Sequence, residues 1–209
     1  MALRLIFVGP PGSGKGTQAQ RLRARGFLHA SSGDMLRAEI AAGTARGRAV
    51  AEVVRNGGLV ADDLLQEIVG AYLRAHRDEP VVLDGYPRNL AQARYLADAT
   101  KIDAAVFFEI SDEILLRRLR DRVIGSDGAI YDLQQYPPPA DITWRRREDD
   151  EPEVTRRRLA VYRAEEAELR EFYRQAGLYQ ALAADLDANQ AAARLSDLVL
   201  RLELAAAPR

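Results

Sequence analysis

The segment from Gly9 to Thr17, Gly-Pro-Pro-Gly-Ser-Gly-Lys-Gly-Thr, has the residue types and spacing of a loop that binds phosphate groups. Such a loop, placed between a strand and a helix, surrounds phosphates with backbone N–H groups, and the start of the helix adds a partial positive charge. Lys15 would reach the β- and γ-phosphates of a nucleotide as a mobile positive charge. The expected triphosphate-binding residues of the loop are Gly12, Ser13, Gly14, Lys15, Gly16 and Thr17.

The loop departs at one position from the common phosphate-loop pattern, in which a serine or threonine follows the lysine. Gly16 follows Lys15 here, and the hydroxyl group comes one residue later, at Thr17. Direct binding of magnesium by Thr17 therefore stays open. The alternative is a glycine-rich turn that only joins a strand to a helix, and the full spacing argues against it. The loop alone does not separate a kinase from a GTPase switch or a transport ATPase, because all three use the same cradle.

The rest of the sequence predicts the elements that would hold this loop. Apolar runs without polar alternation are typical of parallel strands covered on both faces, and they lie at residues 3–8, 81–83, 104–110 and 178–186. Helical patterns lie between and after them, at residues 17–25, 34–40, 61–77, 90–97, 112–122 and 153–175, with a last helix at the C-terminal end. This alternation predicts an α/β fold with a doubly wound parallel sheet. Residues 125–142 contain three consecutive prolines, which disfavour helix and central strand and predict an excursion from the core.

Composition limits the classes of function. The 209 residues fit one domain, and 47% hydrophobic with 29% charged residues is typical of a globular chain. A chain without cysteine has no disulfide, no cysteine-bound zinc and no thiol nucleophile. The net charge of -1 and the lack of an aromatic-rich platform argue against nucleic-acid binding. The apolar run at the N-terminal end is too short to cross a membrane, and we expect a cytoplasmic protein without a membrane partner.

Two further motifs carry a family resemblance. Residues 31–37 read Ser-Ser-Gly-Asp-Met-Leu-Arg, and residues 83–88 read Leu-Asp-Gly-Tyr-Pro-Arg. Together with the phosphate loop, these motifs closely resemble the adenylate kinases of the nucleoside monophosphate kinase family. The resemblance covers nearly the whole chain in the same order, through residues 58–60, Arg118, Arg122, residues 147–150 and Arg158. It implies a phosphate-loop core with a five-stranded parallel sheet and helices on both faces, and the reversible, magnesium-dependent reaction ATP + AMP = 2 ADP, which serves adenine nucleotide homeostasis.

The resemblance implies an AMP site whose phosphate is held by Arg37 and Arg88. Two guanidinium forks suit a phosphate dianion that must lie in line with the donor. Gln92 would contact the acceptor base, because an amide can both donate to and accept from the adenine edge. Ser32 replaces the usual threonine, keeping the hydroxyl but losing a methyl contact, which would loosen base selectivity. The implied AMP-binding residues are Ser32, Arg37, Leu59, Val60, Gly85, Arg88, Gln92, Arg147 and Arg158.

The resemblance also implies a donor site and a set of arginines that close on the transferring phosphoryl group. That group needs charge neutralisation and exclusion of water more than an acid or a base. Arg118 would stack on the ATP adenine, Arg122 would bind the ATP phosphates, and the backbone at Gln190 would contact the adenine. Asp84 would anchor magnesium through water, although a carboxylate at a strand end can also cap a turn. The implied catalytic residues are Lys15, Arg88, Arg122, Arg147 and Arg158, and neighbouring arginines leave the register of the last three open.

By the same resemblance the chain divides into three parts. The core comprises residues 1–30, 61–121 and 159–209, a helical insert that binds the nucleoside monophosphate comprises residues 31–60, and a mobile lid comprises residues 122–158. A lid without cysteines would use polar contacts, for which Asp127, Asp149 and Asp150 are candidates that could equally be surface acids. We expect a monomer that uses Mg²⁺, has no structural zinc, and has ATP, AMP and ADP as its only partners.

Two alternatives remain at this point. One is a nucleoside monophosphate kinase that prefers UMP or CMP, and the other is a phosphate-loop protein that binds a nucleotide without catalysis. Retention of both acceptor arginines argues against the second alternative, because a sensor of ATP alone needs no second phosphate site. His29 receives no role, because this chemistry needs no strong base.

Overall fold

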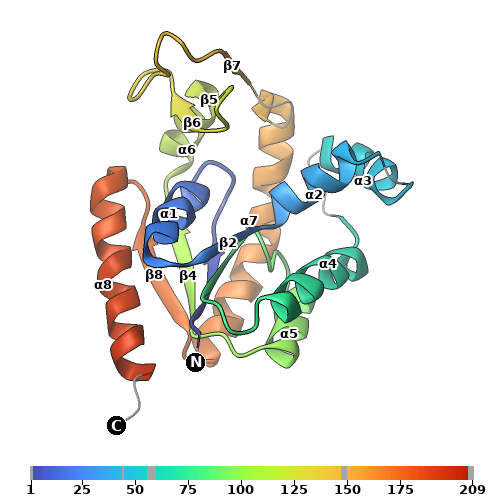
Figure 1. Cartoon of the computed structure of the whole chain (residues 1–209), viewed down its shortest axis with the longest axis vertical. Helices are drawn as coiled ribbons and strands as arrows, with labels where there is room; N and C mark the ends of the chain where they lie inside the picture. Colours follow the sequence, from blue (N-terminus) through green and yellow to red (C-terminus); the bar gives the residue numbers. More distant parts are fainter. Residues whose placement is uncertain (1, 44, 56–59, 147–149, 207–209) are drawn as a thin grey trace.

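Five parallel strands form the centre of the fold in the computed structural model, which describes residues 2–43, 45–55, 60–146 and 150–206 (Figure 1). The strands are β1 (Arg4–Val8), β2 (Leu28–Ser31), β3 (Val81–Asp84), β4 (Ala104–Glu109) and β8 (Tyr179–Ala183). They lie in the order β2-β3-β1-β4-β8, and each neighbouring pair is parallel. The predicted α/β class and its five-stranded parallel sheet are confirmed.

Helices connect the strands and cover both faces of the sheet (Figure 1). They are α1 (Lys15–Leu22), which continues into the 3₁₀ turn η1 (Arg23–Arg25), α2 (Ser32–Ala41), α3 (Ala45–Arg55), α4 (Asp62–Ala75), α5 (Leu90–Ala99), α6 (Asp112–Asp121), α7 (Pro152–Gln175) and α8 (Ala188–Ala206). Side chains of α1 and α8 pack in one apolar core, and side chains of α4, α5 and α7 pack in another. Within the described ranges, no helix combines the length and the apolar composition that crossing a membrane requires.

The two cores follow from the direction of side chains along the central strands. Successive side chains of a strand point to opposite faces of the sheet. In β1, Leu5 and Phe7 join the core beneath α1 and α8, whereas Ile6 and Val8 join the core beneath α4, α5 and α7. A strand that is buried on both faces must be apolar at nearly every position. The central strands therefore read as continuous apolar runs.

Within the five-stranded sheet, β2 is the strand that the apolar pattern of the sequence does not predict. Its sequence is Leu-His-Ala-Ser, and Ala30 alone among these four residues is buried. It lies at the edge of the sheet and pairs with β3, from Leu28 opposite Val81 to Ser31 opposite Asp84. An edge strand that is only partly covered needs no continuous apolar run, so its sequence carries little signal.

Two segments extend from the layered core. The helices α2 and α3 project to one side of the sheet, between β2 and α4 in the sequence (Figure 1). Between α6 and α7, a small antiparallel sheet forms from β5 (Arg122–Gly125), β6 (Ile130–Asp132) and β7 (Trp144–Arg145), in the order β6-β5-β7. The three prolines at 137–139 lie between β6 and β7, outside any helix or strand. The division into core, insert and lid stays a prediction.

The carboxyl ends of the strands meet at one edge of the sheet. Phe7 of β1 and Ser31 of β2 both lie opposite Asp84 of β3, so these three strands end at the same level. From β1 the chain continues to β2 and β3 on one side of the sheet, and to β4 and β8 on the other. Ligands of open α/β sheets bind outside the carboxyl ends at the point where the connections diverge in this way. The loop that begins at Gly9 leaves β1 at that point.

The α6 helix offers a test of this packing, because two neighbouring leucines differ in burial. Leu115 is 0% exposed, and Leu116 is 45% exposed. We expect Leu115→Ala to lower the free energy of unfolding by about 2–5 kcal/mol, because it removes buried surface and leaves a cavity. We expect Leu116→Ala to lower it by less than about 0.5 kcal/mol. Urea unfolding followed by circular dichroism measures both values, and equal losses would contradict the described position of α6.

Candidate functional site

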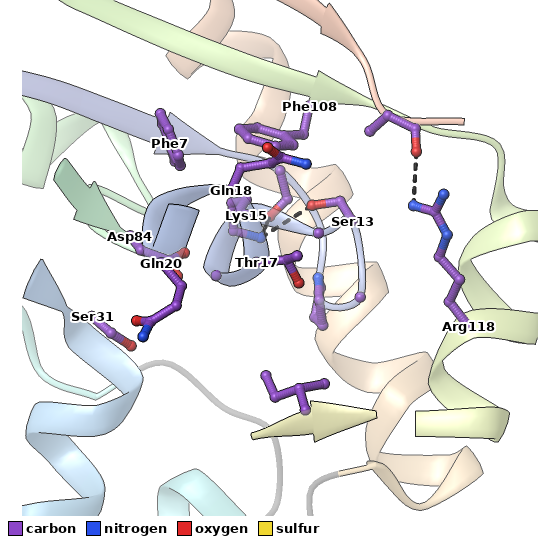
Figure 2. A pocket seen from close by; sticks show the side chains of 18 of the residues that line it. Phe7, Ser13, Lys15, Thr17, Gln18, Gln20, Ser31, Asp84, Phe108 and Arg118 are labelled. Atoms are coloured by element: carbon purple, nitrogen blue, oxygen red, sulfur yellow. Dashed lines mark hydrogen bonds between the residues drawn. The ribbon is translucent and has the colours of Figure 1, made fainter. Parts of the chain in front are cut away.

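A cavity of about 1280 Å³ opens at the carboxyl edge of the sheet. Its walls come from the phosphate loop, the ends of the strands, α2, α7, the small antiparallel sheet and the start of α8. This volume exceeds the roughly 300–1,000 Å³ of most pockets for a single ligand. Figure 2 shows some of the side chains that line it. The predicted site residues among its lining are Gly12, Ser13, Gly14, Lys15, Gly16, Thr17, Arg37, Asp84, Gly85, Arg88, Arg118, Arg122, Arg158 and Gln190.

The phosphate loop wraps around the ammonium group of Lys15 (Figure 2). Lys15 Nζ donates to the backbone oxygens of Gly9, at 2.7 Å, and Pro10, at 2.8 Å. It also lies 3.3 Å from the hydroxyl oxygen of Ser13. The positive charge of Lys15 therefore lies at the centre of the loop. The backbone oxygens that hold it carry no ionisable group, so these contacts do not depend on the protonation of a partner.

The surroundings of Lys15 lower its pKa from 10.5 to about 8. Burial is the largest cause, because it removes water from the charged form. Asp84 opposes this shift, whereas the positive charges of Arg88, Arg158 and Arg122 reinforce it. Three of the arginines predicted to act in catalysis thus repel the ammonium group of the loop. A bound anion with several negative charges would relieve this repulsion.

The first turn of α1 adds to the positive potential of the cavity. Its N-cap residue, Gly14, has no side chain, so no side-chain oxygen caps the first N–H groups of the helix. The first N–H groups of a helix have no partner within the helix and carry a partial positive charge. The loop and the helix start together form the environment that phosphate groups require.

Arg88 is fixed in position by the two motifs that carry the family resemblance. Its Nε donates to the backbone oxygen of Gly85 at 2.7 Å, and its Nη2 lies 3.3 Å from the hydroxyl oxygen of Ser32. The Ser32 hydroxyl in turn donates to the Gly85 oxygen at 2.7 Å. Ser32 is 1% exposed and does not line the cavity. In this structure it supports the guanidinium group of Arg88, and its contact with a base stays a prediction.

Arg37 lines the same part of the cavity from the first turns of α2. Its Nη2 donates to Asp34 Oδ1 at 2.5 Å, one helical turn earlier. Ser31 caps this helix, because its hydroxyl oxygen accepts the N–H of Asp34 at 3.2 Å. The end of β2 therefore passes directly into a helix that presents Arg37 to the cavity on the side of Arg88.

Gln92 is buried, with an exposure of 0%, and does not line the cavity. Its Oε1 accepts the backbone N–H of Arg88 at 2.7 Å, and its Nε2 donates to Asp62 Oδ1 at 2.7 Å. Asn89 also donates to the Asp62 carboxylate, at 3.0 Å and 3.1 Å. Gln92 here holds the backbone at Arg88, and its contact with adenine stays a prediction. Val60 is buried, and Leu59 and Arg147 lie outside the described residues.

The remaining predicted arginines approach the cavity from other elements. Arg122, at the start of β5, forms a two-point ion pair with Asp150, in which Nε donates to Oδ2 at 2.9 Å and Nη2 donates to Oδ1. Arg158 reaches the cavity from α7. Arg118, near the end of α6, donates to the backbone oxygens of Ala184 and Leu186, at 2.7 Å and 3.2 Å (Figure 2).

Asp84 lies at the base of the cavity, at the end of β3. Its Oδ2 lies 3.1 Å from His29 Nε2, and its side chain is 13% exposed. A Cβ atom at Gly16 would lie 3.4 Å from the same Oδ2, at ordinary van der Waals distance, so position 16 lies directly beside this carboxylate. Thr17 lines the cavity with an exposed side chain. A carboxylate and a hydroxyl are the hard oxygen donors that magnesium prefers, and the residues present fit such an ion.

Three polar side chains at the site have no signal in the sequence. His29 contacts Asp84, and Gln18 and Arg21 donate to the backbone oxygen of Ala188, at 2.9 Å and 2.7 Å. The two contacts to Ala188 join residues that are 170 and 167 positions apart. Spacing within a motif cannot reveal such a pair, because a backbone acceptor constrains no residue type.

Comparison with known proteins points to one family. A family model described as "Adenylate kinase" matches residues 7–178. A protein of Agrobacterium fabrum (strain C58) named "Adenylate kinase" is 39% identical over 198 residues, which cover 89% of this chain and 93% of the relative. Relatives with the same name include one from Synechococcus sp. (strain WH7803), 40% identical over 85% of this chain and 88% of its own length. Another, from Thermosipho melanesiensis, is 35% identical over 95% of this chain and all of its own length.

Gly12 and Gly14 allow a test of how closely the phosphate loop packs against α6. Both have positive φ angles, of 83° and 91°, but a Cβ atom at Gly12 would lie 2.6 Å from Leu119 Cγ, whereas one at Gly14 would meet open space. We expect Gly14→Ala to lower the free energy of unfolding by about 1 kcal/mol through backbone strain. Gly12→Ala should lower it by about 1–3 kcal/mol more, because of the crowding.

The double variant Gly12→Ala/Leu119→Ala identifies the source of the difference. It should be less destabilised than the sum of its single variants, because the shorter side chain leaves room for the new methyl group. Equal losses at the two glycines, or an additive double variant in denaturant unfolding, would contradict the contact.

Proposed function

The chain belongs to the adenylate kinase family, and from that premise we propose that it catalyses the reversible transfer of the terminal phosphoryl group of ATP to AMP, giving two ADP. The observation that supports the proposal is the convergence of charge on one cavity. Lys15 lies in the phosphate loop, and the charges of Arg88, Arg122 and Arg158 act on it from three other elements. Such an arrangement suits a triphosphate and a monophosphate that meet end to end.

Positioning and charge neutralisation are the main demands of phosphoryl transfer, because the transferred group carries its negative charge on its outer oxygens. We propose that the backbone of residues 12–17 binds the β- and γ-phosphates of ATP and that Lys15 follows the charge as the group moves. Arg88 and Arg37 hold the AMP phosphate in line with it, and the supports of Arg88 keep its guanidinium group in place before the substrate arrives. Arg122, Arg158 and Arg147 complete the positive surroundings. No covalent intermediate with the enzyme is required.

Magnesium is the cofactor that this proposal includes. Asp84 would hold the ion through water, with the Thr17 hydroxyl as a second oxygen donor from the lining of the same cavity. When bound, the ion neutralises phosphate charge and keeps the donor phosphates in a fixed geometry. His29 keeps the Asp84 carboxylate oriented through their contact of 3.1 Å. A structural zinc ion is no part of the proposal.

The two bases take separate places in this proposal, and of the residues proposed around the acceptor base Gly85 lines the cavity in this structure. The donor adenine lies against Arg118 and the backbone near Gln190, and the acceptor adenine lies among Ser32, Leu59, Val60, Gly85 and Gln92. The α2–α3 segment would form the monophosphate side of the site, and the small antiparallel sheet would form a lid that excludes water from the reaction. We further propose a cytoplasmic monomer that uses ATP, AMP and ADP and binds neither nucleic acid nor a membrane.

The family and the names of the relatives favour this activity over the two alternatives. A kinase for UMP or CMP would share the phosphate loop and both acceptor arginines, so the choice of acceptor base is the point to test. A non-catalytic regulator would have no need for Arg88 to be held by three separate hydrogen bonds beside the phosphate loop.

A coupled assay tests the proposed function. Purified protein with ATP and magnesium should form ADP with AMP at least tenfold faster than with UMP, CMP or GMP, a difference of about 1.4 kcal/mol in transition-state binding. Arg88→Ala should lower kcat by roughly 100-fold or more and weaken AMP binding, since it removes positive charge from the transferring group. Arg94→Ala, on the exposed side of α5, is the matched control. Turnover with UMP or CMP equal to that with AMP would assign the protein to the pyrimidine monophosphate kinases.

The pKa of Lys15 predicts that ATP binding takes up protons above neutral pH. In the free protein this pKa is about 8, because burial and neighbouring arginines disfavour the ammonium form. Bound phosphates add negative charge beside Nζ and raise the pKa, so affinity for ATP should fall as the pH rises above 8. At pH 8.5 binding should take up roughly three quarters of a proton, and at pH 7 about a tenth.

Calorimetric titrations in two buffers of different ionisation enthalpy measure this uptake. Lys15→Met is the control, because without the ammonium group the proton uptake on ATP binding should no longer differ between pH 7 and pH 8.5. The same uptake at pH 7 and pH 8.5 in the unmodified protein would show that Lys15 does not contact the phosphates.

A further inference from the structure

The segment of residues 184–190, which runs from the end of β8 into the first turn of α8, is held by side chains from two other helices. From α1, Gln18 Nε2 and Arg21 Nη1 both donate to the backbone oxygen of Ala188, at 2.9 Å and 2.7 Å. From α6, Arg118 donates to the backbone oxygens of Ala184 and Leu186, at 2.7 Å and 3.2 Å. Three backbone carbonyls of one short segment are thus bound by three side chains.

The segment is also tied at both of its ends. The N–H of Ala184 donates to the backbone oxygen of Glu109, at 2.7 Å, which continues the pairing of β8 with β4. Asp187 Oδ1 accepts the N–H groups of Asn189 and Gln190, at 2.8 Å and 3.0 Å, and so caps the start of α8. Residues 184, 186, 187, 188, 189 and 190 all line the cavity. The segment is a fixed wall of the cavity.

The α1 helix connects this wall to the phosphate loop. α1 begins at Lys15, so its first turn faces the site proposed for the phosphates, while Gln18 and Arg21 lie on one side of the helix in the following turn. Gln18 is 3% exposed, and its Oε1 has no hydrogen-bond partner among the described residues. Only the nitrogen of this amide can donate to a carbonyl oxygen, so the contact with Ala188 fixes the orientation of the side chain.

We propose that Gln18 and Arg21 are positioning residues that dock the 184–190 segment on α1 and thereby set the distance between the base and the phosphates of the donor nucleotide. The proposal rests on the proposed function in one respect, because it takes the donor base to lie against this segment. A nucleotide has a limited span, and two half-sites on separate elements bind it tightly only if their separation is fixed beforehand. Neither side chain needs to contact the nucleotide for this role.

A ligand without a base separates this role from direct phosphate binding. Inorganic tripolyphosphate carries the phosphates of ATP but neither ribose nor base, so it uses the phosphate contacts and not the segment proposed for the base. We expect Arg21→Met and Gln18→Met, which keep an unbranched stem but remove the donors, to raise the Kd for ATP about tenfold. The Kd for tripolyphosphate should stay within about twofold. The KM for ATP should rise with the same ratio, while the KM for AMP stays unchanged.

Arg25→Met is the matched control. Arg25 also attaches the α1 region to α8, through the backbone oxygen of Ser196 at 3.2 Å and Glu203 Oε2 at 2.8 Å, but it does not line the cavity. The Arg25→Met variant should leave the Kd values for ATP and for tripolyphosphate unchanged. Arg21→Lys keeps one donor and should recover part of the ATP affinity. Arg21 is exposed, so its variants report on docking even if the buried Gln18→Met variant fails to fold.

Two results would overturn the proposal. Equal weakening of ATP and tripolyphosphate by Arg21→Met would mean that Arg21 acts on the phosphates or the loop, and unchanged affinity for both would mean that docking has no effect on binding. Calorimetry measures the Kd of each ligand for the unmodified protein and for each variant, and no acceptor nucleotide is present. Absence of transfer to AMP in the unmodified protein would therefore refute the proposed function, while the two Kd values would still decide this inference.

Discussion

Several positive charges must be held around one cavity before any phosphate is present, and this requirement constrains the whole site. Burial inside the loop, together with the charges of three arginines, lowers the pKa of Lys15 to about 8. Five of the cationic groups at the site have oxygen partners in this state. The pairs are Lys15 with the carbonyls of Gly9 and Pro10, Arg88 with Gly85 and Ser32, Arg37 with Asp34, Arg122 with Asp150, and Arg118 with Ala184 and Leu186. In the proposed function, binding of phosphate would exchange these oxygen partners, and affinity would be the difference between two sets of charge-assisted hydrogen bonds.

The sheet supplies the rigidity that this arrangement needs. β1 is buried on both faces, with Leu5 and Phe7 on one side and Ile6 and Val8 on the other, so the loop begins from a strand that cannot shift without disturbing two cores. The pairing of Phe7 with Asp84 places the end of β3 directly beside it. A carboxylate, a lysine and the motif that holds Arg88 thus come to one edge through strand register alone. Apolar packing of the strands thus places these groups at the same edge of the sheet.

The sequence predicts the parts of the site whose residue types are fixed by the chemistry. A phosphate loop needs glycine and lysine at set positions, and the strands beneath it need continuous apolar runs, so both are visible in the chain. β2 is not visible in the sequence. It is an edge strand in which Ala30 alone is buried, so it does not need a continuous apolar run. The contacts of Gln18 and Arg21 with Ala188 are also invisible, because a carbonyl oxygen is present at every residue. Gln92 shows a third case, in which the residue is recognised but its amide in this structure holds Arg88 and Asp62 inside the protein.

The ion pair of Arg122 with Asp150 joins the two ends of the segment that carries the small sheet, beside the cavity. Arg122 is the first residue of β5, and Asp150 lies two residues before α7, so the pair closes the base of the excursion where the chain leaves the core and returns to it. The Asp150 side chain is 3% exposed, and a buried carboxylate needs a partner of opposite charge. Arg122 also lies opposite Asp132 of β6 in the antiparallel pairing, so one residue joins the small sheet to the start of α7.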